Sequence, residues 1–112
     1  QHEPRIDGAI LSSPMLRIHI EGEGDGGAVL LRLEGKLVQP WVQELLEAWT
    51  ALVQRLPEGR EVRVILDAVS FVDECGRSAL CMMGRKGCAF RASGPFMAAV
   101  IEDVKERVAD VR

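Results

Sequence analysis

Histidine and cysteine, the side chains that most often hold metal ions, are scarce in this chain. The two histidines are His2 and His19, and the three cysteines are Cys75, Cys81 and Cys88. No cysteines form a C-x-x-C pair, and neither histidine stands at zinc spacing from a cysteine. We therefore expect no metal site and no cofactor, and an odd, irregularly spaced set of thiols is typical of a reduced cytosolic protein.

Catalytic groupings are missing as well. His2 falls in a loose N-terminal segment and His19 in the middle of a predicted strand, so no Ser/His/Asp or Cys/His set can be assembled. The adjacent carboxylates Asp73 and Glu74 diverge at a predicted helix start, which suits capping better than acid–base chemistry. The sequence therefore predicts a protein that is not an enzyme.

Long apolar runs and basic stripes are absent from the sequence too. No run approaches the about 18 residues that span a bilayer, and residues 1–13 lack the layout of a signal peptide. The formal net charge is −3, without a dense Lys/Arg stripe. Nucleic acid and anionic membrane are poor partners for such a chain, and we expect it in the cytoplasm.

Its 112 residues, 47% hydrophobic and 28% charged, suit one globular domain. Residues 1–14 contain Pro4, Gly8 and Pro14 without sustained periodicity and are expected to form a flexible arm. Residues 15–112 are expected to form the domain.

Seven elements are predicted along this domain from alternating and helical patterns. They are strands at 15–21 and 28–34 joined by a hairpin loop at 22–27, a helix at 40–56, a strand at 62–66, a helix at 76–86, a strand at 88–92 and a final helix opening at 93–95. The order β-β-α-β-α-β-α predicts an α/β fold in which a small mixed sheet has helices packed against it.

Apolar residues at helical spacing define the faces of the first and last helices. Pro40 suits the first position of its helix, and Trp41 and Trp49 are expected to pack on the sheet. The predicted face of the first helix comprises Trp41, Val42, Leu45, Leu46, Trp49, Leu52, Val53 and Leu56. That of the last helix comprises Phe96, Met97, Val100, Ile101, Val104 and Val108.

Gly22, Gly24 and Gly27 formally match the G-x-G-x-x-G pattern of dinucleotide sites. That site needs a helix immediately afterwards, so that the helix N-terminus meets the pyrophosphate. Here a strand-like run follows, and Glu23 and Asp25 would repel phosphate. We therefore do not predict a dinucleotide site.

The segment from Val64 to Leu80, V-I-L-D-A-V-S-F-V-D-E-C-G-R-S-A-L, is the most informative of the chain, and its turn region runs from Val69 to Arg77, V-S-F-V-D-E-C-G-R. An apolar run ends in an acidic turn, and a helix is predicted directly after it. This turn resembles the V-x-F-[ILVM]-D-S-[SAT]-G-L pattern of the STAS domain, found in bacterial anti-sigma-factor antagonists and in sulfate-transporter tails. The flanking L-R-L-E-G-K-L and C-A-F-R-A-S-G-P segments also fit, and the resemblance covers about residues 15–108.

The resemblance implies a non-catalytic switch that regulates transcription by binding a protein partner. In the resembling antagonists the unphosphorylated domain docks on an anti-sigma kinase and releases the sigma factor. Phosphorylation of a serine directly after the turn aspartate then dissociates the complex. Asp73 matches that aspartate and Gly76 the turn glycine, whereas Glu74 occupies the serine position.

Several residues depart from the pattern. Cys75 replaces the small, often hydroxylated residue after the serine, and Arg77 replaces an apolar residue. Asp67 resembles an acid at the end of the family's strand, but its link to the turn is short. With Glu74 in the serine position and Cys75 after it, neither position keeps the hydroxyl that phosphorylation-controlled switching requires. Ser70, expected to stabilise the loop, and Ser78 are the nearby hydroxyls that remain.

Three accounts of the turn stay open. In the first, a structural role is sufficient: Asp73 caps the helix N-terminus, and the helix dipole favours the negative charge of Glu74 in the first turn. Alternatively, Glu74 partly mimics a phosphorylated serine. Cys75, near a helix N-terminus, is an alternative thiol switch, although the adjacent carboxylates oppose thiolate formation and favour a structural role.

Two functions from different classes follow from the resemblance. The first is a protein-interaction module of an anti-sigma-factor antagonist type, whose docking surface is predicted at Asp73, Glu74, Cys75, Gly76, Arg77 and Ser78. Its partner would resemble an anti-sigma kinase. The second is a regulatory subunit or tail of a membrane transport system, with a transporter component as partner. Nucleotide binding, sometimes proposed for the family, has no P-loop to support it here.

Overall fold

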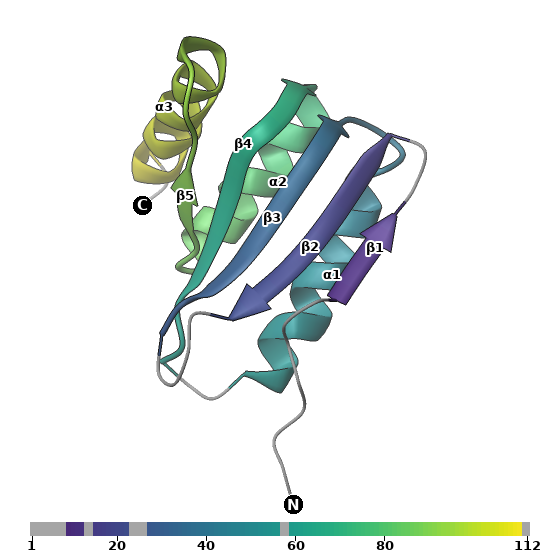
Figure 1. The fold of residues 1–112 in the computed structure, drawn as a ribbon. Coiled ribbons are helices and arrows are strands. Elements are labelled where there is room, and N and C mark those ends of the chain that lie inside the picture. Colours follow the sequence, from purple (N-terminus) through teal and green to yellow (C-terminus); the bar gives the residue numbers. More distant parts are fainter. Residues whose placement is uncertain (1–8, 13–14, 23–26, 57–58, 111–112) are drawn as a thin grey trace, which may run out of the picture.

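A mixed five-stranded sheet with two helices against one of its faces organises this protein (Figure 1). The computed structural model describes residues 9–12, 15–22, 27–56 and 59–110. The strands follow the sheet in the order β1-β2-β3-β4-β5. Their bounds are β1 Ala9–Ser12, β2 Leu16–Gly22, β3 Val29–Leu37, β4 Val62–Val72 and β5 Ala89–Arg91, and the helices are α1 Val42–Arg55, α2 Glu74–Arg85 and α3 Pro95–Asp110.

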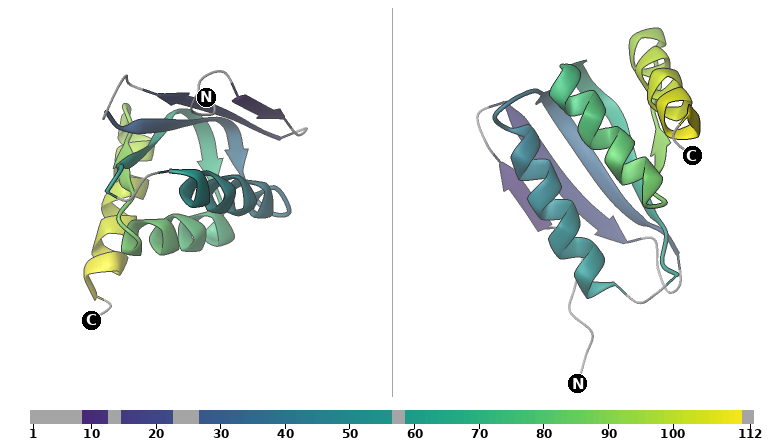
Figure 2. Two further views of the ribbon diagram at one scale, coloured as in Figure 1. Left: turned by 90° about the horizontal axis from the view of Figure 1, so that it is seen from below. Right: turned by 180° about the vertical axis from the view of Figure 1, so that it is seen from behind.

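The predicted fold class and element order are confirmed from β2 onward. Strands β2 and β3 form the predicted antiparallel hairpin, whereas β3–β4 and β4–β5 are parallel pairs joined through α1 and α2. Both crossovers place their helix on the same face of the sheet, as the views from below and behind show (Figure 2). Helix α3 lies instead beside the β5 edge, where it contacts α2 and β4.

The N-terminal segment differs from the expected flexible arm. Residues 9–12 form β1, which pairs antiparallel with β2 at the edge of the sheet. Four residues contain too few alternations to indicate a strand by themselves, and the exposed edge of β2 supplies the backbone partners. Residues 1–8, 13–14 and most of the predicted 22–27 loop lie outside the described residues.

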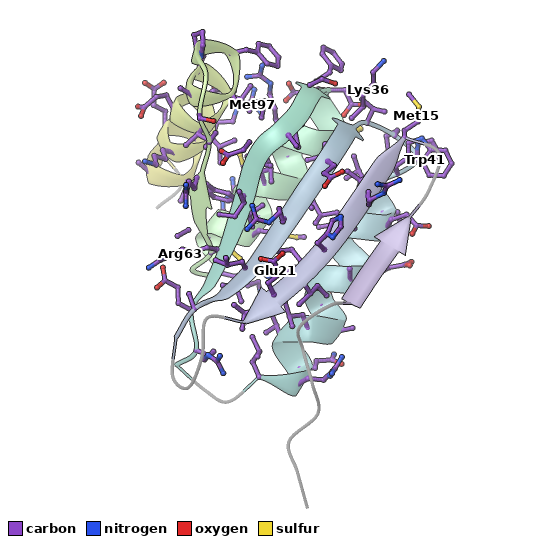
Figure 3. The ribbon with its side chains drawn as sticks, viewed as in Figure 1. Met15, Glu21, Lys36, Trp41, Arg63 and Met97 are labelled. Carbon is purple, nitrogen blue, oxygen red and sulfur yellow. The ribbon has the colours of Figure 1, made fainter. Side chains whose placement is uncertain are left out.

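One face of the sheet holds the core and the other is polar, as expected for an open sheet face. Leu16, Ile18 and Ile20 of β2 are buried toward the helices. The intervening positions carry cross-strand ion pairs, among them Arg32–Glu21 at 3.1 Å. Figure 3 shows Glu21 and Arg63 on this polar face. The alternation in the sequence therefore predicted both faces of β2.

Strand β4 is longer than predicted. The sequence indicated a strand at 62–66, whereas β4 continues to Val72, so that Asp67 and Ser70 lie within the strand and not in a loop. Val69 and Val72 remain buried, and the ladder with β3 continues through two register shifts. The shifts break the strict alternation of period two that identifies a strand from sequence, which explains the early predicted end.

The predicted helix bounds are corrected at several ends. Helix α1 begins at Val42 because the amides of Trp41 and Val42 both bond to the Val38 carbonyl in a preceding turn, which contains Pro40. Helix α2 runs from Glu74 to Arg85 where 76–86 was predicted, and β5 occupies only three of the residues 88–92.

The apolar helix faces are mostly buried as predicted. Trp49 is buried in the core, and Trp41 is partly buried against it near the end of the sheet where β3 stops (Figure 3). Val53 and Phe96 were assigned to these faces but are 45% and 47% exposed. Both stand at the margin of an apolar stripe, where helical periodicity alone does not decide burial. Among the described residues, no helix is both long and apolar enough to cross a membrane.

Candidate functional site

Asp73 links the start of α2 to the start of α1. One carboxylate oxygen, Oδ1, accepts a hydrogen bond from the Gly76 amide at 2.7 Å, and Oδ2 accepts one from the Gln39 amide at 3.0 Å. The first bond is the predicted N-cap, which satisfies an amide that the helix leaves free. The second holds the loop between β3 and α1. The turn is thus fixed on two sides by one side chain.

Gly76 is buried where the first turn of α2 approaches the end of β3. A Cβ atom at this position would lie 2.5 Å from the Leu37 carbonyl oxygen and 2.7 Å from Val72 Cγ1. The Asp73 amide also donates to the Leu37 carbonyl, at 3.1 Å. The resemblance marked Gly76 as the turn glycine, and the structure supplies the physical reason: only hydrogen fits between the helix and the strand.

Glu74, in the serine position of the turn, forms a two-pronged ion pair with Arg107 of α3. The Arg107 Nη1–Glu74 Oε2 distance is 2.7 Å and the Nη2–Oε1 distance is 3.3 Å. Arg107 also approaches Asp103 at 3.3 Å, and Asp103 pairs with Arg77 at 2.8 Å. We call Glu74, Arg77, Asp103 and Arg107 the charge cluster; it joins the first turn of α2 to α3.

The charge cluster lowers the pKa values of its two carboxyl groups. The hydrogen bond from Arg107 lowers the pKa of Glu74 below its ordinary 4.5, with further help from the Arg107 charge. The hydrogen bond from Arg77 does the same to the pKa of Asp103. Since Glu74 is 71% exposed, solvent screens its pair, and we expect a modest contribution to stability.

We predict that Arg107→Gln returns the pKa of Glu74 toward its ordinary value. A carboxyl group whose pKa is lower in the folded than in the unfolded state stabilises the fold at pH values above its unfolded-state pKa. This stabilisation is lost as the pH falls through the folded-state pKa. The variant should therefore lose stability relative to the native chain at neutral pH but much less in acid below the folded pKa. Carboxyl-carbon NMR titration of Glu74 and urea unfolding at both pH values measure this.

Lys105→Gln, which removes an exposed cation of α3 outside the charge cluster, is the matched control. It should leave the titration of Glu74 almost unchanged. An equal shift in both variants would mean that net charge, and not the ion pair, sets the Glu74 pKa.

A cleft lies on the other side of Glu74, between the start of α1 and the outer face of α2. Its volume is about 340 Å³. Three of the predicted docking residues, Glu74, Cys75 and Ser78, line it on α2, and Met82 lines it one turn further along. The α1 side is formed by Gln39, Val42, Gln43 and Leu46. We call this the turn cleft.

The six predicted docking residues therefore divide into three groups. Glu74, Cys75 and Ser78 face the turn cleft, with Cys75 exposed. Asp73 and Gly76 hold the backbone of the turn. Arg77 turns away from the cleft to meet Asp103. Ser70, assigned to the loop by sequence, bonds from β4 to the Gly35 carbonyl at 3.3 Å.

Sequence reasoning missed the partners of these residues on α1 and α3. Asp103 and Arg107 lie outside the predicted apolar face of the last helix, and their i, i+4 spacing is that of a side-chain pair on a helix surface. Nothing in the sequence places that face against the first turn of α2. Local sequence patterns also could not predict that residues of α1 form one wall of the turn cleft.

The architecture has a close parallel among solved structures. A crystal structure of an anti-sigma factor antagonist from Mycobacterium paratuberculosis matches with a TM-score of 0.64 and 21% sequence identity. The match covers 89% of this chain and 100% of that chain. This chain has the STAS fold of an anti-sigma factor antagonist. No protein-family model and no curated protein matches the sequence.

In this STAS fold the acidic turn lies at the end of β4, between the turn cleft and the charge cluster. Figure 2 shows α1 and α2 side by side across the sheet, and α3 lies at the edge of the sheet, where it contacts α2. The N-terminus of α2 is therefore flanked by α1 on one side and by α3 on the other. Glu74 pairs with Arg107 of α3 and lines the turn cleft together with α1. A change of charge at position 74 would therefore alter the electrostatic environment of both helices.

Proposed function

We propose that this protein is a non-catalytic interaction module in the cytoplasm that works as an anti-sigma-factor antagonist in partner-switching control. The observation that supports this most strongly is the arrangement at the acidic turn. Within a STAS fold, the acid in the serine position lies on the rim of an open cleft between α1 and α2. A partner that binds this turn would contact the charge of Glu74 and the cleft at the same time.

The turn cleft is the proposed docking surface. Met82, 37% exposed, and partly buried Leu46 give it an apolar floor, and Glu74 and Ser78 give it a polar rim. An apolar centre with a polar rim is the usual composition of a protein–protein contact. Asp73 and Gly76 serve this surface by fixing the turn, and Arg77 serves it by holding α3.

Glu74 is proposed to act as a fixed acid where the resembling antagonists have a switchable serine. Its carboxylate carries a charge of about −1, against about −1.5 to −2 for phosphoserine, so the mimicry is partial. Arg107 holds the carboxylate by two contacts. An unphosphorylated serine at this position would be too short and uncharged to hold Arg107, whereas a phosphoserine offers acceptor oxygens to a guanidinium. The glutamate thus keeps the turn in one charge state.

We predict that Glu74→Ser converts the fixed turn into a switchable one. Without the carboxylate, the variant should bind an anti-sigma kinase from the same genome at least about tenfold more tightly, which corresponds to roughly 1.4 kcal/mol. With ATP, it should be labelled at position 74 and then released. Pull-down with radiolabelled ATP, together with binding isotherms in its absence, measures both effects.

Glu102→Ser, at an exposed position of α3, is the control for loss of one negative charge. It should bind and label like the native chain. The proposal of a fixed acid fails if Glu74→Ser matches Glu102→Ser in both affinity and labelling.

A further inference from the structure

A row of exposed side chains crosses the sheet at the end where β3 and β4 stop. The Lys36 amide donates a hydrogen bond to the Met15 carbonyl at 2.8 Å, and Lys36 is also the register partner of Phe71. The residues that follow these three in the chain are all buried in the core: Leu16, Leu37 and Val72. Because side chains alternate along a strand, Met15, Lys36 and Phe71 lie on the opposite, polar face of the sheet. We call them the end row, and Figure 3 shows Met15 and Lys36 at this end of the sheet.

The end row places a cation between two exposed apolar side chains. Phe71 is 48% exposed and Met15 is 37% exposed, although neither side chain gains from contact with water. Phe71 is the most exposed of the large apolar side chains that the structure describes. Aromatic residues and methionine are enriched in protein–protein contacts, where burial of one aromatic side chain often dominates the affinity. The row therefore has the composition of a contact for another protein.

Lys36 supplies a positive charge that no described carboxylate neutralises. It is exposed, and it forms no ion pair with any residue that the structure describes. Glu34, two residues earlier on the same face of β3, pairs with Arg17 of β2 instead. The segments that connect elements at this end of the sheet, 13–14 and 38–41, contain no acidic residue. The charge of Lys36 is therefore available to a carboxylate of another molecule.

The end row adjoins the acidic turn through two short lengths of backbone. On β4, one residue separates Phe71 from Asp73, so their Cα atoms lie within about 7 Å of each other. On β3, the Leu37 carbonyl that follows Lys36 accepts a hydrogen bond from the Asp73 amide at 3.1 Å. The row and the turn therefore keep a fixed separation, and one partner can contact both.

We propose that the end row is a second docking contact for the protein partner of the acidic turn, and that this partner places there a carboxylate side chain flanked by apolar side chains. The inference rests on the proposed function and adds the chemistry of the partner at this contact. The apolar groups of the partner cover Met15 and Phe71, and its carboxylate pairs with Lys36. The turn carries the opposite charge at Glu74, so the partner meets an acid and a cation at a fixed separation. Such an arrangement excludes partners whose charges have the reverse order.

A lipid surface fits the end row less well than a protein does. Anionic headgroups attract clusters of several Lys and Arg side chains, whereas the row contains Lys36 alone. The neighbouring Asp73 and Glu74 repel such headgroups, and the chain has a net charge of −3. A protein can place one carboxylate beside Lys36 and away from these acids, which a uniformly anionic surface cannot do.

Charge reversal at Lys36 tests the proposal, with an anti-sigma kinase from the same genome as the binding probe. Lys36→Glu should weaken binding of the kinase at least about tenfold, because an acid then faces the carboxylate of the partner. A set of kinase variants, each with one exposed Asp or Glu changed to Lys, provides the complementary half of the test. One of them should restore binding to Lys36→Glu by about tenfold and weaken binding to the native chain. Binding isotherms without ATP measure both effects.

Two matched controls separate the end row from general effects. Lys86→Glu makes the same change of charge at the opposite end of α2 from the acidic turn, and it should alter binding by less than about twofold. Phe71→Ala should weaken binding at least about tenfold, whereas Val53→Ala, at a 45% exposed apolar residue in the last turn of α1, should have no effect. Because all four side chains are exposed, each variant should keep its fold, which circular dichroism checks.

Equal effects within either pair of variants overturn the end row as a contact, and so does the absence of any kinase variant that restores binding to Lys36→Glu. If Glu74→Ser still binds the kinase more tightly than the native chain does, the proposed function stands without this contact. Binding of the native chain to phosphatidylserine vesicles that Lys36→Glu abolishes would assign the row to a membrane and overturn the protein contact. If the kinase binds neither the native chain nor Glu74→Ser, the proposed function and this inference fail together.

Discussion

Replacing Gly76 by alanine is expected to lower the free energy of unfolding by about 1–2 kcal/mol. Overpacking a tight contact costs typically about 1–3 kcal/mol, and the higher helix propensity of alanine returns up to about 1 kcal/mol. The new Cβ would stand 2.5 Å from the Leu37 carbonyl oxygen, a backbone atom held by its bond from the Asp73 amide. Neither the strand nor the helix can move aside without breaking the turn. Urea unfolding, or a fall in Tm of roughly 4–8 °C per kcal/mol, measures the loss.

Gly84→Ala is the matched control, since it makes the same substitution within the same helix. A Cβ at Gly84 would lie 3.2 Å from Phe90 Cε2 and Val108 Cγ2, which are side-chain atoms that can yield by small rotations. The propensity gain then offsets most of the tighter contact, and stability should change little. If Gly84→Ala cost as much as Gly76→Ala, the backbone contact at Leu37 would not be the reason that Gly76 is a glycine.

Asp73→Ala is expected to cost about 1–2 kcal/mol and to loosen the turn cleft. Loss of an N-cap typically costs about 1 kcal/mol, within a range of about 0.5–2 kcal/mol. The second bond, from the Gln39 amide, connects the turn to the residues that precede α1. Both ends of the cleft should therefore become more mobile together. Amide hydrogen exchange at Gln39 and Gly76, with urea unfolding for the total, measures the effect.

Asp73→Asn and Asp67→Ala separate the causes. Asparagine is as good a cap as aspartate, and its one side-chain oxygen can replace only one of the two bonds, so an intermediate loss is expected. Asp67 is exposed on β4, and its removal deletes the same charge without touching the turn. Faster exchange at Gly76 but not at Gln39 in Asp73→Ala would show that the link between the two loops is not maintained by this side chain.

The acidic turn illustrates how far local sequence goes toward a functional site. The N-cap role of Asp73 was predicted correctly because capping depends on residues within one helical turn. The partner of Glu74 was not predicted, because Arg107 lies 33 positions away on another helix. Its position follows from the second crossover, which brings the chain through β5 before α3 begins. The docking role of the turn, like the fixed-acid role of Glu74, remains a prediction.

The turn cleft shows the same contrast between what local sequence predicts and what only the folded chain reveals. Helical periodicity predicted the apolar stripes of α1 and α3, and most residues of these stripes are buried. It did not predict the turn cleft between α1 and α2, because the cleft depends on the distance between two helices that are predicted separately. Gly76 admits α2 close to the end of β3, and this approach sets where Cys75 and Ser78 stand relative to α1.

The sequence by itself determined the elements whose causes are short-range: the polar and apolar faces of β2, the stripes of α1 and α3, the capped start of α2 and the order that gives a STAS fold. The tertiary structure alone decided the full length of β4, the pairing of β1, the charge cluster and the turn cleft. Periodicity and capping act over a few residues, so a sequence displays them directly. Ladder register across bulges and the seating of one helix against another depend on segments far apart in the chain, and only the folded chain brings those together.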